Sequence, residues 1–190
     1  VLLSRYRGRD PFCDPFCGSG TIPIEAALIA KNRAPGLERS FAAQKWKTMP
    51  GTLWLDAAEE AMDKEFHGSY DIWGGDIDPA AVELSRHNAA LAGVEDCVRF
   101  EVADAGKFHR ESAYGQLVTN PPYGERLLEK TEAEALYRRF GAAARTLPPG
   151  WRVVVLSSHT EFERAFGRPA DKKRKLYNGM LKCDAFLYGR

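Results

Sequence analysis

The sequence predicts an α/β protein with a Rossmann-like, doubly wound and mostly parallel seven-stranded sheet that ends in a C-terminal antiparallel hairpin. Short apolar runs alternate with helical patterns along the chain, which indicates parallel strands joined by crossover helices. A turn rich in small residues, 14–21, separates the first strand from the first helix, as a ligand-binding loop would. Near the end, Asn178-Gly179 separates two strand-like segments and indicates the hairpin.

The first third of the chain is predicted to contain one strand and two full helices. Residues 1–6 read as the end of a helix, and residues 9–13 read as the first strand. Residues 22–30 are strong helix formers, with Pro23 confined to the first turn, where its missing N–H costs nothing. Residues 52–66 read as an amphipathic helix, because apolar residues recur there at helical spacing among charged ones.

A long segment without clear periodicity, residues 33–49, separates these two helices. Loops of this length are uncommon unless they are functional or disordered. Phe41 and Trp46 argue against disorder, so we expect a packed excursion near the ligand site. A structural flap that does not contact a ligand is the alternative.

The rest of the chain alternates strands with helices. Gly93 suits the end of one helix, and Pro148-Pro149-Gly150 stops the next one. The predicted strands are 70–75, 98–102, 116–119 and 152–157, the helices are 79–92, 133–147 and 161–166, and the hairpin is 174–188.

Composition restricts the class of protein. With 190 residues, of which 44% are hydrophobic and 28% charged, the chain suits one domain with its own core and is not largely disordered. No run approaches the roughly 20 apolar residues of a membrane span, and the start does not resemble a signal peptide. We therefore expect a cytoplasmic protein without a membrane partner. The net charge of +1 means that affinity for a polyanion must come from local patches.

The cysteines and histidines show no metal-ligand spacing. Cys13, Cys17, Cys97 and Cys183 form no Cys-x-x-Cys pair, and the four histidines are scattered. We expect reduced cysteines and no bound metal.

Polar residues follow several of the predicted strands. Because the carboxyl ends of parallel strands share one edge of a sheet, we expect Asp76, Asp104 and Asn120 to meet the glycine-rich loop in one crevice. An acid after the second strand suits ribose hydroxyls, and Asp76 is the candidate, with Asp78 as its competitor. An NAD site is not expected, because Asp76 comes 56 positions after Gly20 and the loop lacks a third glycine.

The segment Asn120-Pro121-Pro122-Tyr123 is the most specific feature of the sequence. The prolines fix the backbone, so the Pro121 carbonyl can face outward beside the Asn120 side-chain oxygen. Two acceptors suit one NH2 donor, and Tyr123 offers a face for a planar base, worth about 1–3 kcal/mol. Hydrogen bonds accepted from an amine that is conjugated with a ring or carbonyl favour its pyramidal, nucleophilic form. The segment therefore predicts methyl transfer to such an amine.

Together these motifs resemble the class I S-adenosylmethionine-dependent amino-methyltransferases. Longer strings are similar to the bacterial THUMP-linked methyltransferases that modify guanine N2 in large-subunit, 23S ribosomal RNA. The likeness spans nearly the whole chain, which implies one class I catalytic domain over residues 1–190, with the family's N-terminal THUMP, RNA-binding region outside it. The strings are 20–27, 39–42, 45–46, 120–127 and 175–179.

The resemblance implies a role for each motif. The glycine-rich loop would wrap the methionine part of S-adenosylmethionine, Asp76 would hold the ribose with Ile77 beside it, and Asp104 with Ala105 would meet the adenine. The segment 120–123 would hold the target amine, with Tyr123 stacked on the guanine. The implied loop residues are Asp14, Pro15, Phe16, Gly18, Ser19, Gly20 and Thr21, and the implied catalytic residues are Asn120, Pro121, Pro122 and Tyr123.

Four basic residues are candidates for contact with RNA. Arg126 follows the predicted catalytic loop, and Lys172, Lys173 and Arg174 form a run beside the predicted hairpin. A solvated surface without RNA contact is the alternative. A target guanine inside a helix would have to be flipped out, at a cost of about a few kcal/mol.

Other functions stay open on the sequence alone. Transfer-RNA guanine-N2 methyltransferases share most of the strings, and the chemistry of the segment 120–123 also suits a DNA base or a protein glutamine. A cofactor-binding RNA adaptor without turnover is the alternative from another class, and the intact segment 120–123 argues against it. The expected function is S-adenosylmethionine-dependent methylation of guanine N2 in RNA.

Overall fold

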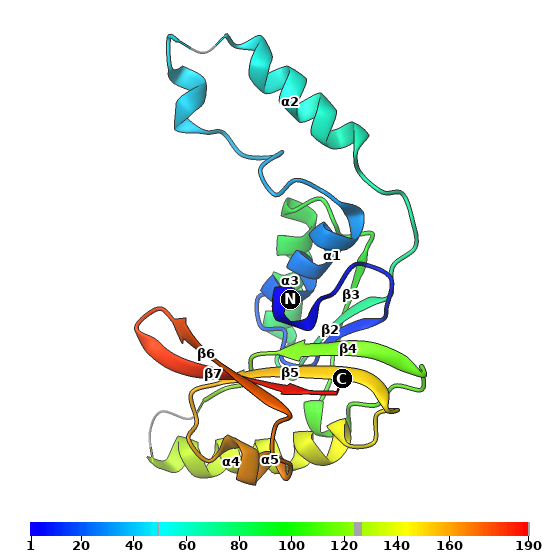
Figure 1. Cartoon of the computed structure of the whole chain (residues 1–190), viewed down its shortest axis with the longest axis vertical. Coiled ribbons are helices and arrows are strands. Elements are labelled where there is room, and N and C mark those ends of the chain that lie inside the picture. Colours follow the sequence, from blue (N-terminus) through cyan, green and yellow to red (C-terminus); the bar gives the residue numbers. More distant parts are fainter. Residues whose placement is uncertain (49, 124–126, 190) are drawn as a thin grey trace.

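A computed structural model of the chain describes residues 1–48, 50–123 and 127–189. Strands and helices alternate around one sheet (Figure 1). The strands are β1 (Phe12–Asp14), β2 (Ile72–Asp76), β3 (Val98–Val102), β4 (Tyr114–Thr119), β5 (Gly150–Ser157), β6 (Lys172–Asn178) and β7 (Leu181–Tyr188). The α-helices are α1 (Thr21–Lys31), α2 (Thr52–Asp63), α3 (Pro79–Leu91), α4 (Leu127–Ala144) and α5 (Phe162–Phe166). Short 3-10 helices are η1 (Leu2–Ser4), η2 (Ala42–Lys45) and η3 (Ala105–Lys107).

The described part of the chain forms a seven-stranded sheet in the order β3-β2-β1-β4-β5-β7-β6. Strands β1 to β5 are parallel, and β7 runs antiparallel between β5 and β6. From β1 the chain winds outward through β2 and β3, and it then returns to β4 and β5 on the other side of β1. The winding direction reverses between β1 and β4, where doubly wound folds bind ligands at the carboxyl ends of the strands. The predicted fold class is confirmed.

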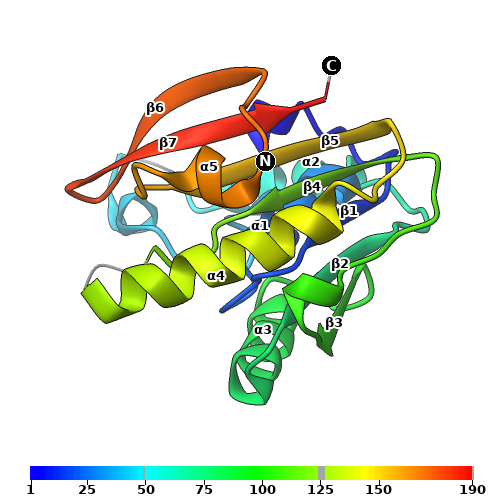
Figure 2. The same ribbon diagram turned by 90° about the horizontal axis from the view of Figure 1, so that it is seen from below.

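Helices cover both faces of the sheet. Figures 1 and 2 show α1 and α3 on one face and α4 and α5 on the other. Because side chains alternate along a strand, Phe12 of β1 joins the core beneath α1 and α3, whereas Cys13 joins the core beneath α4 and α5. Tyr137 and Phe140 of α4 are completely buried in the second core. This packing fixes the strand ends that carry the site.

The segment after α1 does not lie near the crevice, so the predicted packed excursion near the site is wrong. Residues 34–48 and 50–66, which we call the arm, contain η2 and α2 and project from the body of the molecule (Figure 1). No residue of α2 is buried. The Phe41 ring stacks on Trp54, with centroids 5.6 Å apart, so aromatic residues of the arm pack on one another.

The type or extent of several elements also differs from the prediction. Residues 1–6 contain the 3-10 helix η1 instead of the end of an α-helix. Helix α4 begins at Leu127, earlier than the predicted residue 133, because exposed residues such as Thr131 and Glu132 carry no apolar periodicity there. Among the described residues, no helix is both long and apolar enough to cross a membrane.

Candidate active site

A cavity of about 380 Å³ lies at the carboxyl ends of β1, β2 and β4. Its size is within the range of ligand pockets. The structure brings the three predicted motifs together there: the wall includes Pro15, Phe16, Gly18, Asp76, Ile77, Asp104, Ala105, Asn120, Pro121, Pro122 and Tyr123. Four other predicted residues, Asp14, Ser19, Gly20 and Thr21, do not line it.

The glycine-rich loop after β1 is held in place by α3. Ser85 donates a hydrogen bond of 2.7 Å to the Gly18 carbonyl, and Asn88 donates one of 2.9 Å to the Ser19 carbonyl. Gly18 and Gly20 have positive φ values of 53° and 84°. A Cβ on Gly20 would come within 3.0 Å of the Ser85 Cβ, whereas a Cβ on Gly18 would meet nothing within 4 Å. Gly20 therefore allows close packing, and Gly18 leaves the backbone open toward the cavity.

Asp14 lies beneath this loop and is only 1% exposed. Its Oδ1 accepts hydrogen bonds from the Phe16 N–H at 3.0 Å and the Thr119 hydroxyl at 2.5 Å. Its Oδ2 is buried and has no hydrogen-bond partner among the described residues. Burial disfavours the charged form and raises the Asp14 pKa to about 7. Asp14 thus supports the loop from below, with one carboxyl oxygen still able to accept a hydrogen bond.

Two carboxylates follow β2, and the structure distinguishes them. Asp76 accepts the N–H of Gly18 through Oδ2 and the N–H of Asp78 through Oδ1, both at 3.0 Å. Asp78 accepts the Ala80 N–H at 2.9 Å and caps α3. Only Asp76 lines the cavity. Farther along the wall, Asp104 accepts the Gly106 N–H at 2.8 Å and caps η3.

The segment after β4 is fixed by α4 and β5. The Tyr137 hydroxyl donates to the Pro122 carbonyl at 2.5 Å and lies 3.4 Å from the Ser157 hydroxyl. The Tyr123 hydroxyl donates to Oδ1 of the exposed Asn120 at 2.5 Å. Burial raises the Tyr123 pKa to about 12, so this hydroxyl keeps its proton at neutral pH. The contact holds the Asn120 oxygen in one orientation.

The cavity wall also contains residues that the sequence did not indicate. Ala103 follows β3, and Leu136 and Arg139 come from α4. Arg139 reaches the wall because α4 packs closely against η3. The two helices are so close that a Cβ added to Gly106 of η3 would lie 3.1 Å from the Arg139 Cβ. No local motif marks these positions, since only the packing of α4 places them.

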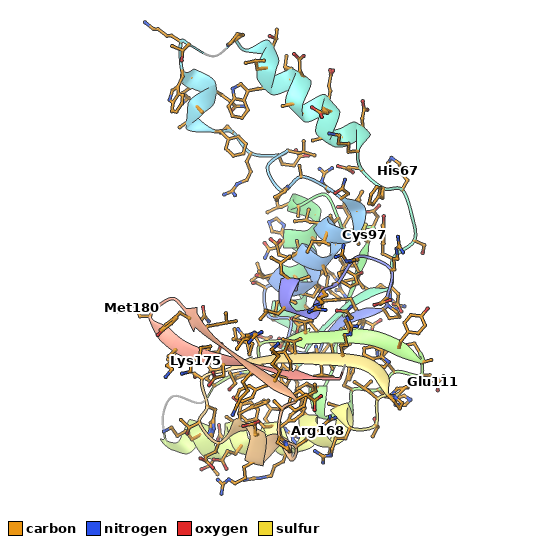
Figure 3. The ribbon with its side chains drawn as sticks, viewed as in Figure 1. His67, Cys97, Glu111, Arg168, Lys175 and Met180 are labelled. Atoms are coloured by element: carbon orange, nitrogen blue, oxygen red, sulfur yellow. The ribbon has the colours of Figure 1, made fainter. Side chains whose placement is uncertain are left out.

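The structure does not bring the predicted RNA-binding run to this cavity. Lys172, Lys173 and Arg174 begin β6, which β5 and β7 separate from β4. Lys173 pairs with Glu163 at 2.8 Å. Figure 3 shows Met180 at the tip of the β6–β7 hairpin, whereas this basic run lies at the opposite end of β6. Arg126 lies outside the described residues.

Comparison with known proteins gives consistent matches. Residues 1–186 match the family described as "RMKL-like, methyltransferase domain". "Putative RNA methyltransferase YpsC" of Bacillus subtilis (strain 168) is 43% identical over 192 residues, covering 99% of this chain and 49% of that protein. "Ribosomal RNA large subunit methyltransferase K/L" of Shewanella baltica (strain OS185) is 41% identical over 180 residues, covering 92% of this chain and 25% of that protein.

A solved structure is similar along the whole chain. The crystal structure of SMU.472 complexed with SAH superposes with a TM-score of 0.94 at 42% identity, covering 100% of this chain and 50% of that one. The chain thus spans half or less of the length of these three relatives.

Proposed function

This chain belongs to the RMKL-like methyltransferase domain family, and from that premise we propose that it methylates the exocyclic N2 amine of a guanine in RNA, with 23S ribosomal RNA as the expected substrate. Its cofactor is S-adenosylmethionine, as the SAH complex of a close structural neighbour indicates. The observation that carries the proposal is that Asn120 and Tyr123 share one cavity with the glycine-rich loop and Asp76.

The residues of the cavity fit this cofactor. Gly18 exposes backbone without a Cβ, and Asp76 presents a carboxylate suited to ribose hydroxyls. We assign the ribose to Asp76 because Asp76 lines the cavity, whereas Asp78 caps α3 outside it. Asp104 and Ala105 are assigned to the adenine, and the loop 15–18 to the methionine part. When bound, S-adenosylmethionine supplies an electrophilic methyl group.

The segment 120–123 prepares the amine. The Asn120 oxygen has two lone pairs, of which one accepts the Tyr123 hydroxyl, so the other can accept an N–H of the substrate. The Pro121 carbonyl is assigned to the second N–H. With both protons held by Asn120 and Pro121, the nitrogen lone pair would be directed out of the plane of the base and would be available as a nucleophile. The N–CH3 bond would form as the S–CH3 bond breaks, so that S-adenosylhomocysteine would leave as a neutral thioether. The nitrogen would then carry the positive charge and would lose it by giving one proton to water. Proximity and orientation supply most of the rate.

Methylation assays with RNA, DNA and protein substrates, analysed by mass spectrometry, test this function. We expect N2-methylguanosine in RNA. Asn120→Ala should cost about 3 kcal/mol in the transition state, which is on the order of a 100-fold loss in kcat, as for one oxyanion-hole donor. Cofactor affinity, measured by calorimetry, is the internal control and should stay within about twofold, because Asn120 is assigned to the amine.

The outcomes separate the alternatives. Methyl groups on DNA or on protein glutamine would replace the proposed substrate but keep the chemistry. N2-methylguanosine in transfer RNA would change only the identity of the RNA substrate in the proposal. If Asn120→Ala keeps at least half of the activity, the mechanism is wrong. Cofactor binding without any methylated product would favour an RNA adaptor.

A further inference from the structure

A second cavity, of about 570 Å³, adjoins the first. It lies where β5 ends, between the first turns of α4 and the start of β7, and Glu134 and His159 line it. Tyr123 belongs to the walls of both cavities. A base stacked on Tyr123 with its amine at Asn120 would therefore extend its remaining atoms toward this second cavity. The cavity is large enough for a nucleobase.

Two carboxylates line this cavity, and Glu134 is the less exposed of them, since the Glu161 side chain is 53% exposed and pairs with Arg164. Three basic side chains lie near Glu134. Its side chain is 20% exposed, and its Oε2 lies 3.0 Å from Arg138 Nη2 and 3.8 Å from Arg164 Nη2. Its Oε1 lies 3.6 Å from His159 Nε2. An ionised carboxylate has about four lone-pair sites, so these contacts leave it able to accept a hydrogen bond from a ligand.

His159 lies beside the Glu134 carboxylate, and its buried Nε2 has no hydrogen-bond partner among the described residues. The His159 ring is 6% exposed, and its Nδ1 accepts the Glu161 N–H at 3.1 Å. A neutral imidazole that accepts through Nδ1 carries its proton on Nε2, which here faces Glu134. The Tyr137 ring packs edge-on against the imidazole at 5.7 Å. The hydrogen bond from Arg138 holds the Glu134 carboxylate at the cavity wall, where it can accept a hydrogen bond from a ligand.

The chemistry of the bases gives Glu134 a use. Guanine, adenine and cytosine all carry an exocyclic amine, but the Watson–Crick ring nitrogen beside it is an N–H donor only in guanine. The same position in adenine and cytosine is an acceptor. A carboxylate accepts a hydrogen bond from the guanine N1–H, whereas it repels the ring-nitrogen lone pair of adenine or cytosine. It therefore selects guanine both by attracting this base and by repelling the other two.

We propose that the second cavity receives the target guanine and that Glu134 accepts its N1–H, which selects guanine among the bases that carry an exocyclic amine. This inference rests on the proposed function and adds the residue that reads the base. The exposed Lys130 and Lys182 also line this cavity and suit the phosphates beside the base.

The test compares two single-stranded RNA oligonucleotides that differ at one base. One carries a single guanine, and the other carries 2-aminopurine, which keeps the 2-amine but has an acceptor at N1. Wild-type protein should methylate the guanine RNA with a kcat/KM about 10- to 100-fold higher, the worth of one hydrogen bond to a charged group. Binding of both RNAs in the presence of SAH is measured by fluorescence anisotropy, so that a result does not depend on turnover.

Glu134→Gln should lower kcat/KM on guanine RNA by about 10- to 100-fold and leave 2-aminopurine RNA unchanged or improved, so that discrimination is lost. The matched control is Glu132→Gln, an exposed glutamate of α4 that does not line this cavity. It should preserve both values.

Each outcome is decisive. Equal activity and equal binding of the two RNAs by wild-type protein would overturn the proposal that Glu134 recognises the guanine N1–H. An equal loss on both RNAs in Glu134→Gln would make Glu134 structural. If wild-type protein instead methylates adenine or cytosine and not guanine, the proposed function itself fails.

Discussion

Asp14 is completely buried beneath the glycine-rich loop, yet it carries an ionisable carboxyl group. Its pKa is raised to about 7 in the folded protein by burial, from an ordinary value near 3.8. Between these values the folded state holds the proton more tightly than the unfolded state. The stabilisation is complete below about pH 4 and is lost as the pH rises through about 7.

Asp14→Asn should therefore flatten the pH dependence of stability. In the wild-type protein without cofactor, raising the pH from about 4 to about 7 should reduce the free energy of unfolding by a few kcal/mol through the ionisation of Asp14. Asparagine does not titrate, so the variant should lack this component in urea denaturation measured across that range. Asp56→Asn on the exposed side of α2 is the control and should keep the wild-type slope. Identical slopes for all three proteins would contradict the prediction.

At the scale of elements, α4 acts as the support of the segment 120–123. Tyr137 is 0% exposed and hydrogen-bonds the Pro122 carbonyl, so helix and loop are joined at a fixed point. The contact lies behind the loop and outside both cavities. We therefore expect Tyr137 to act as a positioning residue for Asn120.

Tyr137→Phe removes one hydroxyl and leaves a buried carbonyl without this partner. We expect kcat to fall about tenfold, since such a loss costs on the order of 1–3 kcal/mol, while cofactor affinity stays unchanged. Tyr177→Phe, on a side chain that is 72% exposed in β6, is the control. An unchanged kcat, or a loss of cofactor affinity equal to the loss of kcat, would argue against positioning.

Arg33 is one of three residues at the end of α1 that join the arm to the body. The Lys31 carbonyl accepts the Phe66 N–H at 2.7 Å, and the Asn32 side chain donates to the Lys64 carbonyl at 2.9 Å.

The Arg33 guanidinium contacts Glu65 at 2.5 Å, Glu38 at 2.8 Å and the Ala92 carbonyl at 3.1 Å. The side chains of Arg33 and Glu65 are only 13% and 7% exposed. Removing one partner of such a pair leaves an uncompensated buried charge.

Arg33→Ala should release the arm without damaging the site. We expect residues 34–66 to be cut faster in limited proteolysis, and a free-energy cost of about 3–5 kcal/mol at this contact. Lys64→Ala is the matched control, because Lys64 pairs with Glu60 on the solvent side of the same arm. Cofactor binding should be the same in both variants. Equal proteolysis rates would show that Arg33 does not hold the arm.

At the scale of the whole molecule, the net charge of +1 leaves RNA affinity to local patches. The basic residues 172–174 at the start of β6 place their side chains on opposite faces of the sheet. Lys172 and Arg174 line a cavity with Arg152, whereas Lys173 is on the face where Glu163 neutralises it. The three basic residues therefore cannot act as one patch.

If this run contacts RNA, Lys172→Gln combined with Arg174→Gln should weaken binding and reduce the salt slope. For two phosphates on a single strand, the slope of log K against log salt should fall by about 1.4. Lys173→Gln is the control and should change the slope less, because Glu163 already compensates its charge. Fluorescence anisotropy over a salt series measures the slopes, and an unchanged slope in the double variant would reject RNA contact there.

Much of this arrangement follows from local sequence. The alternation of strands and helices predicted the doubly wound sheet, because each segment's periodicity reports its own secondary structure. The positions of Asp76, Asp104 and Asn120 at strand ends predicted a shared cavity, because parallel strands end at one edge. The roles of these residues stay predictions until the variants are measured.

Other features depend on contacts between distant segments. The periodicity of α2 predicted a helix, but an apolar stripe does not specify what covers it, and here its side chains are exposed on the arm. Asp76 is distinguished from Asp78 by its place in the cavity wall and by the hydrogen bonds that the two carboxylates accept from Gly18 and Ala80. Arg139 and Glu134 reach the cavities because α4 packs beside β5 and η3.

The fold class, the glycine-rich loop and the segment 120–123 could be identified from local sequence, because they depend on backbone conformation and on side chains that are neighbours along the chain. Contacts between distant segments bury Asp14, join Tyr137 to the segment 120–123 and place Glu134 in the wall of a second cavity, and none of these could be read from local sequence. The physical reason is that burial, pKa and hydrogen-bond partners are set by residues far apart in sequence, which local patterns do not report.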